Sequence, residues 1–209
     1  MNAANVIRLL IVDDHSLFRA GIAALIANEP DMEIVGEAST GEHAISQFHA
    51  LRPDITLMDL RMPKLNGIDA LMAIRKAHPT ARVIVLTTYD GDVLAERALR
   101  AGARAYLLKG TIRKGLVDSI RAVQSGKKQV SPDVAVRLAQ HIGEECLSER
   151  ETEVLKLAAV GNTNKGIAGS LSISEETAKG HLKSILQKLG AKDRTHAVAL
   201  SFARGIIMM

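Results

Sequence analysis

The first strong structural signal in the chain is LLIVDDHSLFRAG, residues 9–21. Four apolar residues run into two adjacent carboxylates, Asp13 and Asp14, and a segment with helical spacing follows. A short, continuous apolar run is typical of a strand that is buried on both faces, as in parallel sheets covered by helices. The stretch therefore predicts a buried strand that leads into a helix, with two like charges at the junction that need an explanation.

Apolar runs of the same kind recur through the first 125 residues, at positions 7–12, 34–38, 55–58, 83–86 and 105–108. Amphipathic segments of helical length lie between them, among them residues 17–27, 68–77 and 94–101. Parallel strands need crossover connections, and helices usually supply them. This alternation predicts an α/β domain with a doubly wound, five-stranded parallel sheet and helices on both faces.

The composition limits the class of protein. With 209 residues, 47% of them hydrophobic, the chain is long enough for one large domain or two small ones, each with a core. Aromatic residues make up only 2%, which disfavours a protein that binds single strands by stacking bases on aromatic side chains. The single Cys146 excludes an internal disulfide. No apolar run approaches the roughly 20 residues of a membrane span, so we expect a soluble cytoplasmic protein without a membrane partner.

Positive charge is concentrated toward the C-terminal end. Residues 1–125 carry 15 Lys and Arg against 14 Asp and Glu, whereas residues 126–209 carry 12 against 9. This bias is compatible with a polyanionic partner, although an ordinary solvated surface explains it equally well.

The pattern changes after residue 125. We interpret residues 126–146 as a partly helical linker, in which Ser131 is the expected N-cap and Pro132 the first helical residue. From residue 147 to residue 209 no strand pattern returns, and we expect an all-α domain.

Four helices are expected in this second domain. Ser148 and Glu151 have the spacing of a capping box for the first helix. The next two helices cover residues 163–171 and 174–189, and the fourth begins after Asp193 and runs to about residue 203. The tight SIS connection between the second and third helices is typical of a helix-turn-helix.

Polar residues stand where the predicted strands end: Asp13 and Asp14 after the first, Asp59 after the third, Thr87 after the fourth and Lys109 after the fifth. In open parallel sheets, ligands bind at this edge, where the strand order reverses. Three converging carboxylates would repel one another without a cation, and a few hard oxygen ligands suit Mg²⁺. For the adjacent pair alone, interaction with a helix N-terminus is the alternative.

A phosphoryl group on Asp59 would give every one of these strand ends a role. The ammonium of Lys109 would balance its charge, and the hydroxyl of Thr87 would bind one of its oxygens. Asp59 is then the predicted nucleophile, which forms an aspartyl phosphate. The two like charges at the end of the first strand are explained as metal ligands.

The motifs IVDDH, LMDLRMPKLNGIDAL, VIVLTTYD and AGARAYLLK resemble the receiver domain of bacterial two-component response regulators. The resemblance implies a flavodoxin-like receiver domain at residues 1–125, in which Asp59 accepts a phosphoryl group from a sensor histidine kinase. It also implies that Asp13, Asp14 and Asp59 hold Mg²⁺, and that Thr87 and Lys109 contact the phosphoryl group. Tyr106 corresponds to the aromatic switch residue that moves inward with Thr87. The alternative interpretation is that Tyr106 is an ordinary half-buried strand residue.

The third helix of the second domain has two different faces. Ala178, Leu182, Ile185 and Leu189 repeat at helical spacing and predict a buried stripe. The opposite face carries Lys179, Gly180 and Lys183, which would fit a DNA major groove. A solvated face is the alternative, and periodicity does not exclude it.

The sequence LSERETEVLKLAAVGNTNKGIAGSLSISEETAKGHLKSILQKLGAKDRTHAVAL is similar to the LuxR-type DNA-binding domain of NarL/FixJ-class regulators. This resemblance implies that Lys179, Gly180 and Lys183 contact the groove, and that the DNA backbone is contacted by Thr163, Lys165, Thr177 and Lys188. It also implies that the fourth helix pairs two copies through Thr195, Val198 and Phe202. The sequence departs from the family pattern at Gly166, where an acid is usual, and at Gly180, where a larger side chain is usual.

The function we expect is a transcription regulator in which phosphorylation of Asp59 controls homodimerisation and binding to two half-sites in double-stranded DNA. Such a protein is not an enzyme beyond its own phosphoryl transfer and dephosphorylation. One alternative is a Mg²⁺-dependent phosphohydrolase with an aspartyl nucleophile, although the dehalogenase type places that residue after the first strand, with a second acid two residues on. The other alternative is a phosphorylation switch that acts only through protein partners, which salt-sensitive DNA binding would exclude.

Overall fold

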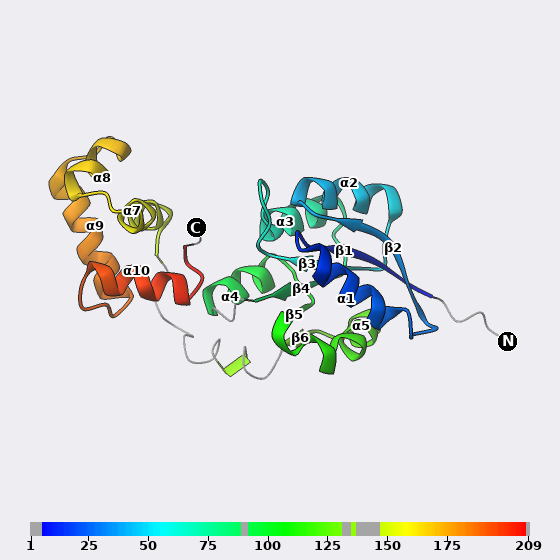
Figure 1. Ribbon diagram of the computed structural model, residues 1–209. Coiled ribbons are helices and arrows are strands. Elements are labelled where there is room, and N and C mark those ends of the chain that lie inside the picture. Colours follow the sequence, from blue (N-terminus) through cyan, green and yellow to red (C-terminus); the bar gives the residue numbers. More distant parts are fainter. Residues whose placement is uncertain (1–5, 89–91, 131–134, 137–146, 208–209) are drawn as a thin grey trace. The chain divides into compact units, whose positions relative to one another are not determined.

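The computed structural model describes residues 6–88, 92–130, 135–136 and 147–207, and the chain divides into two compact units (Figure 1). The first unit contains the sheet with its helices, and the second contains the C-terminal helices. None of the helices in the described ranges is long and apolar enough to cross a membrane.

The first unit alternates strands and helices. Its elements in chain order are β1 (Ile7–Val12), α1 (Ser16–Ile26), β2 (Met32–Ala38), α2 (Gly41–Leu51), β3 (Ile55–Asp59), α3 (Gly67–Ala77), β4 (Val83–Thr87), α4 (Asp92–Arg100), β5 (Ala105–Leu108), the 3₁₀ helix η1 (Lys109–Lys114), α5 (Leu116–Gln124) and β6 (Gln129–Val130). The strand order is β2-β1-β3-β4-β5-β6, and every neighbouring pair is parallel. The order reverses between β1 and β3, which confirms the predicted doubly wound α/β class.

All five predicted strands are present, and a sixth short strand extends the sheet. In β6, Gln129 and Val130 pair with Ala105 and Tyr106 of β5. The sheet therefore continues into the segment 126–146 that the sequence predicts as a linker. The expected helix start at Ser131 and Pro132 lies outside the described residues.

Strand residues alternate between two buried layers. Leu9, Ile11 and Leu57 belong to a core that also contains Ile22 of α1 and Ile120 of α5. Figure 1 shows α1 and α5 on one side of the sheet and α2 and α3 on the other. Because both faces are covered, the central strands β3 and β4 are buried along their whole length, and the buried carboxylates of Asp13 and Asp59 stand at the carboxyl ends of β1 and β3.

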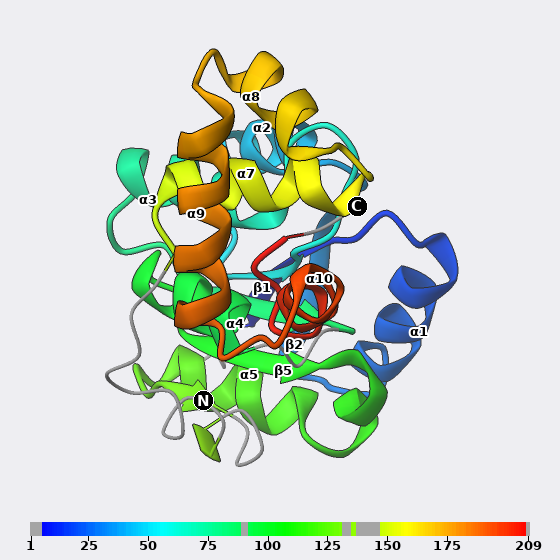
Figure 2. The ribbon, with the colours of Figure 1, turned by 90° about the vertical axis from the view of Figure 1, so that its left-hand side faces the viewer.

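The second unit consists of α7 (Glu149–Ala159), α8 (Asn164–Leu171), α9 (Glu175–Lys188) and α10 (Arg194–Ala203), as Figure 2 shows. The predicted capping box at Ser148 and Glu151 is confirmed, with bonds in both directions. Side-chain oxygens of Thr163, Ser174 and Asp193 cap the other three helices. One capping residue thus precedes each of the helices α7 to α10, and caps act locally, so these helix starts can be recognised in the sequence.

The predicted apolar stripe of α9 faces the core of this unit. Ala178 and Ile185 are fully buried, and Leu182 and Leu189 pack against the same cluster. Lys179, Gly180 and Lys183 lie on the exposed side. The α8–turn–α9 pair thus has the helix-turn-helix arrangement, with one face of α9 free of core contacts.

Candidate functional site

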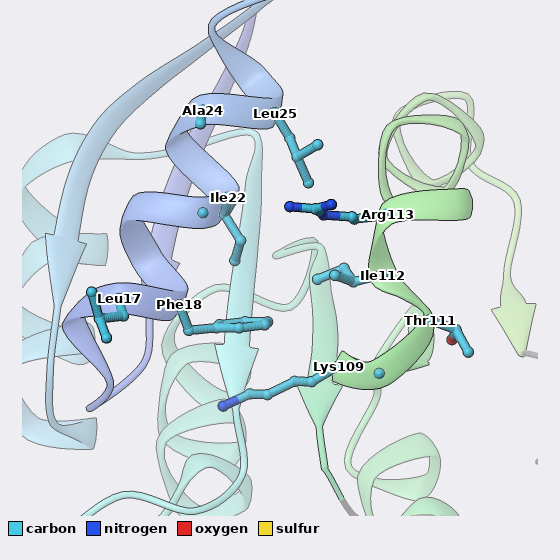
Figure 3. Close-up of a pocket in the computed structure, with 11 residues that line it drawn as sticks. Leu17, Phe18, Ile22, Ala24, Leu25, Lys109, Thr111, Ile112 and Arg113 are labelled. Carbon is cyan, nitrogen blue, oxygen red and sulfur yellow. The ribbon is translucent and has the colours of Figure 1, made fainter.

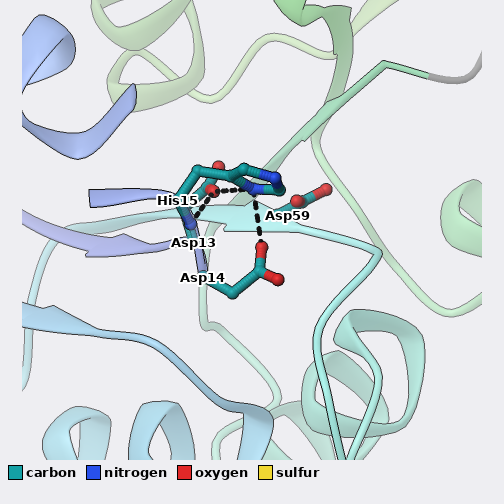
Figure 4. Close-up of side chains that lie close together, drawn as sticks. All are labelled: Asp13, Asp14, His15 and Asp59. Atoms are coloured by element: carbon teal, nitrogen blue, oxygen red, sulfur yellow. Dashed lines mark hydrogen bonds and ion pairs between the residues drawn. The ribbon is translucent and has the colours of Figure 1, made fainter. Parts of the chain in front are cut away.

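The carboxyl ends of β1 and β3 bring three acids together. In the sheet, Val12 pairs with Met58, so Asp13 and Asp59 leave adjacent strands at the same level. Figure 4 shows Asp13, Asp14 and His15 facing Asp59. One potential ligand atom from each of these four residues lies within 4.8 Å of the others. The convergence expected from strand order alone is therefore present.

Lys109 connects this cluster to the end of β5. Its Nζ lies 2.6 Å from Oδ2 of Asp13 and 2.6 Å from Oδ2 of Asp59. The ammonium also lies 4.6 Å from the centre of the Phe18 ring, a cation–π distance. A single, largely buried cation thus bridges the two buried acids.

Asp59 is 3% exposed, and its Oδ1 accepts a hydrogen bond from the main-chain N–H of Arg61 at 3.2 Å. Burial raises the pKa of its carboxyl, Lys109 opposes this effect, and the charge of Asp13 adds to it. The net result is a raised pKa of Asp59. The positive charge of Lys109 therefore does not fully offset the cost of burying the ionised carboxylate.

The donor set fits a divalent cation. Asp13 is 1% exposed, and its Oδ2 makes the ion pair with Lys109 but no hydrogen bond within the described part of the chain. Carboxylate oxygens are hard ligands, and three of these groups against one ammonium leave an excess of negative charge. Asp13, Asp14 and Asp59 could therefore hold Mg²⁺.

His15 belongs to the same cluster, although it was not among the predicted site residues. Its Nδ1 lies 2.8 Å from Oδ1 of Asp14 and 3.2 Å from Oδ1 of Asp13. Its main-chain N–H donates to the same Asp13 oxygen at 2.9 Å. The only sequence signal for this contact was its position directly after the two acids.

Thr87 and Tyr106 are both fully buried, on the neighbouring strands β4 and β5. Thr87 stands at the carboxyl end of β4, on the edge that carries the acids. Tyr106 is therefore more deeply buried than the half-buried strand residue of the alternative interpretation. Its movement as a switch stays a prediction.

Gly67 is a second residue that the sequence did not single out. A Cβ at this position would lie 2.0 Å from the main-chain oxygen of Asp59. Its N–H donates to the carbonyl oxygen of Leu60 at 3.1 Å. Only a glycine lets the start of α3 pack directly against the backbone that carries Asp59.

A cavity of about 620 Å³ lies between α1 and η1, beside Lys109 (Figure 3). Its walls are mostly apolar and include Phe18, Ile22, Leu25 and Ile112. Leu17, at its rim, is 89% exposed. The ammonium that bridges the acids is thus flanked by an apolar surface of α1.

The residues predicted to contact DNA occupy different environments. Lys165, Thr177, Lys179, Gly180 and Lys183 are exposed. Lys179 pairs with Glu175 at 3.2 Å, one turn earlier on α9. Thr163 is also exposed, and its hydroxyl caps α8 by accepting the N–H of Gly166. Apart from the adjoining backbone of α9, no atom of the described residues lies within 4 Å of a Cβ built at Gly180, so the missing side chain leaves open surface.

Lys188 lies differently from the other predicted DNA contacts. Its side chain is 21% exposed, and its Nζ lies 3.0 Å from Oε2 of Glu151 on α7. This contact directs the ammonium toward a buried carboxylate and ties α9 to α7. Contact of Lys188 with the DNA backbone stays a prediction.

The residues predicted to pair two copies lie on α10. Thr195 is exposed, whereas Val198 and Phe202 are partly buried and pack against the core of their own unit. The exposed parts of these two side chains remain available to a partner, so pairing through α10 stays a prediction.

Two family models match the chain. The response regulator receiver domain matches residues 9–121, and the model for bacterial regulatory proteins of the luxR family matches residues 145–201. The response regulator protein VraR of Staphylococcus aureus is 38% identical over 206 residues, which cover 96% of this chain and 99% of VraR.

Solved structures agree with these matches. RcsB from Salmonella enterica serovar Typhimurium, bound to the promoter P1flhDC with the phosphomimetic BeF₃⁻, is 28% identical, with coverage of 94% and 98% and a TM-score of 0.74. The response regulator ChrA of a heme-sensing two-component system is 35% identical, with coverage of 97% and 100% and a TM-score of 0.58. The chain has an acidic edge on a doubly wound sheet and a helix-turn-helix unit after it, as the matched families do. It therefore belongs to the two-component response regulators of the NarL/FixJ class.

Proposed function

We propose that Asp59 accepts a phosphoryl group from a sensor histidine kinase. The observation that carries this proposal is the contact of Lys109 Nζ with both Asp59 and Asp13 at 2.6 Å, on the edge where the sheet order reverses. A bridging ammonium beside a buried carboxylate offers a counter-charge for a phosphoryl group on that carboxylate. Thr87, at the end of the next strand, would offer its hydroxyl.

In this transfer, an Oδ atom of Asp59 attacks the phosphorus atom of the kinase phosphohistidine. The new O–P bond forms as the P–N bond breaks, and its electron pair stays on the imidazole nitrogen. Mg²⁺, held by Asp13, Asp14 and Asp59, would neutralise charge on the phosphoryl oxygens when bound. Lys109 would stay close to Asp59 and bind a phosphoryl oxygen.

The helical unit is the proposed output. Structures of RcsB bound to DNA support this role, because RcsB is similar to this chain over nearly its whole length. The proposed groove contacts are Lys179, Gly180 and Lys183, and the proposed backbone contacts are Thr163, Lys165, Thr177 and Lys188. Pairing through Thr195, Val198 and Phe202 would place two copies on two half-sites. Residues 1–125 extended by β6 would form the receiver, and residues 147–209 the DNA-binding domain.

We propose a regulator whose only chemistry is the gain and loss of its own phosphoryl group. The hydrolase alternative of the dehalogenase type needs a nucleophile after the first strand and a second acid two residues on, whereas the acids after β1, Asp13 and Asp14, are adjacent and residue 15 is His. The alternative of a switch that acts only through protein partners predicts no salt-dependent affinity for duplex DNA, so measuring that affinity separates the two.

The direct test is labelling of the full-length protein by a small phosphodonor, such as acetyl phosphate, with Mg²⁺. We expect Asp59→Asn to abolish labelling, because an amide oxygen is a poor nucleophile. Asp118→Asn, which changes an exposed acid on α5, is the matched control and should be labelled like the wild type. Persistent labelling of Asp59→Asn would place the nucleophile elsewhere.

A further inference from the structure

Arg19, in the first turn of α1, lies next to the acidic cluster and has no part in the chemistry proposed above. Its side chain is only 18% exposed. Nη1 donates a hydrogen bond to the main-chain oxygen of Asp13 at 2.7 Å, and Nε donates to Oε2 of Glu37 at 2.6 Å. Since Glu37 lies on β2, this guanidinium joins α1, the end of β1 and the neighbouring strand.

These contacts complete the bonding of the Asp13 backbone. The N–H of Asp13 donates to the carbonyl oxygen of Ala38, directly after Glu37 in β2, at 3.0 Å. With its carbonyl oxygen bound by Arg19, both main-chain polar groups of Asp13 have partners. The turn that leaves β1 is thus held by Arg19, and Arg19 is itself held by Glu37.

The orientation of this turn matters for the acids on it (Figure 4). The carbonyl of Asp13 and the N–H of Asp14 belong to one planar peptide unit. A bond to that carbonyl therefore sets the direction in which Asp14 continues from Asp13. Mg²⁺ requires a nearly ideal octahedral arrangement of ligands, so a small rotation of this peptide would weaken its binding.

We propose that Arg19 is a positioning residue for Mg²⁺ binding by Asp13 and Asp14, with Glu37 as its anchor. The inference rests on the proposed function, because it takes the acidic cluster as a Mg²⁺ site. An arginine–glutamate pair with a purely structural role would change the stability of the protein and leave its Mg²⁺ affinity unchanged. The two roles therefore differ in a measurable quantity.

The chain offers a matched control in Arg8. Its Nη1 also donates to a main-chain carbonyl, that of Arg52 at 3.0 Å, and its Nε lies 3.8 Å from Oε1 of Glu33 on β2. Arg8 is near the start of β1, whereas the acids follow its end. Arg8→Ala thus removes the same kinds of contact at the opposite edge of the sheet.

The experiment titrates Mg²⁺ calorimetrically into the full-length wild type, Arg19→Ala, Arg19→Lys, Glu37→Gln and Arg8→Ala, without a phosphodonor. We expect Arg19→Ala to raise the Mg²⁺ Kd about tenfold, the lower end of the usual effect of groups that orient metal ligands. Arg19→Lys and Glu37→Gln should raise it less, and Arg8→Ala should leave it unchanged. Labelling of Asp59 at saturating Mg²⁺ should return to the wild-type rate in Arg19→Ala.

A Kd for Arg19→Ala equal to that of Arg8→Ala would overturn the inference, as would a labelling rate that saturating Mg²⁺ does not restore. If Arg19→Ala does not fold, Glu37→Gln decides, and an unchanged Kd in that variant counts against the inference. Failure of the proposed function looks different, because the wild type itself would then show neither Mg²⁺ binding nor labelling at Asp59.

Discussion

Lys109 sets the charge balance at the acidic edge of the sheet. It is the cation shared by Asp13 and Asp59, yet burial still raises the pKa of Asp59 despite this contact. One ammonium therefore compensates two buried carboxylates only in part. The residual negative charge is a physical reason for a divalent cation to bind there, and it links the ligand chemistry to the packing of β1, β3 and β5.

Gly67 gives a test of how tightly the backbone of Asp59 is packed. In Gly67→Ala, the added methyl group would meet the Asp59 carbonyl oxygen at 2.0 Å, so α3 must shift. We expect a loss of about 1–3 kcal/mol in the free energy of unfolding, measured by urea denaturation, as for other overpacked sites. We also expect slower labelling of Asp59 by acetyl phosphate.

Gly21→Ala is the control for this substitution. Gly21 lies within α1, and apart from the adjoining backbone of its own helix no atom of the described residues is within 4 Å of a Cβ built there. Alanine should stabilise the helix by up to about 1 kcal/mol at such a position. Equal unfolding free energies for Gly67→Ala and Gly21→Ala would show that α3 can shift without a loss of stability.

Helix α9 is held against α7 by one buried carboxylate. Glu151 accepts hydrogen bonds from the main-chain N–H of Ser148 at 2.7 Å, from Ser184 Oγ at 2.6 Å and from Lys188 Nζ at 3.0 Å. Burial alone would raise its pKa, but these donors outweigh burial and lower the pKa to about 2. The same residue thus caps α7 and fixes the helix that carries the proposed groove contacts.

This network predicts a pH dependence for the helical unit. Because the folded pKa of Glu151 lies below its usual value of 4.5, the ionised form stabilises the fold above about pH 4.5, and this stability is lost as the pH falls toward 2. Its contribution is at most about 3 kcal/mol, and less after solvent screening. We expect Glu151→Gln to speed hydrogen exchange of α9 amides at pH 7, with a difference from wild type that shrinks at acid pH. Glu153→Gln, which removes an exposed ion pair with Arg150, should have little effect on this exchange. Equal exchange rates of the α9 amides in the two variants would contradict the proposed role of Glu151.

The exposed face of α9 gives a separate prediction. Lys179→Ala and Lys183→Ala remove cations that have no role in the core, so both variants should fold normally. Each should weaken binding to duplex DNA and reduce the slope of log affinity against log salt by about 1, measured by fluorescence anisotropy. Lys76→Ala, on an exposed face of α3, is the charge-matched control. Wild-type affinity in both α9 variants would remove this face from the proposed interface.

Local signals in the sequence predicted most elements, because periodicity and caps act over a few residues. Ser148, Thr163, Ser174 and Asp193 marked their helices correctly. Strand β6 escaped prediction, since its two residues become a strand only by pairing with β5, more than 20 residues earlier.

The acidic site was predictable for a related reason. Strand order places Asp13, Asp59 and Lys109 at one edge, whatever the details of packing. Partners between distant segments were not predictable. The position of Lys188 depends on Glu151, 37 residues away, and that of Arg19 on α1 depends on Glu37 on β2.

The two units have different kinds of core. In the first, a parallel sheet is buried under helices on both faces, and several charged side chains are buried together at its acidic edge. In the second, four short helices share a small apolar cluster and expose a basic face. In the proposed function a phosphoryl group would act on the first unit and DNA would bind the second, so regulation requires a coupling free energy between them.

This coupling can be measured in the whole protein. Phosphorylation at Asp59 should raise the affinity for duplex DNA, and couplings of this kind are typically about 5–150-fold. The measurement compares DNA affinity with and without acetyl phosphate and Mg²⁺, for the wild type and for Asp59→Asn, at one fixed salt concentration. Only the wild type should respond, and its response should disappear as the phosphoryl group is lost. Stoichiometric labelling of the wild type with no change in DNA affinity would mean that the phosphoryl group on Asp59 does not regulate DNA binding by the helical unit.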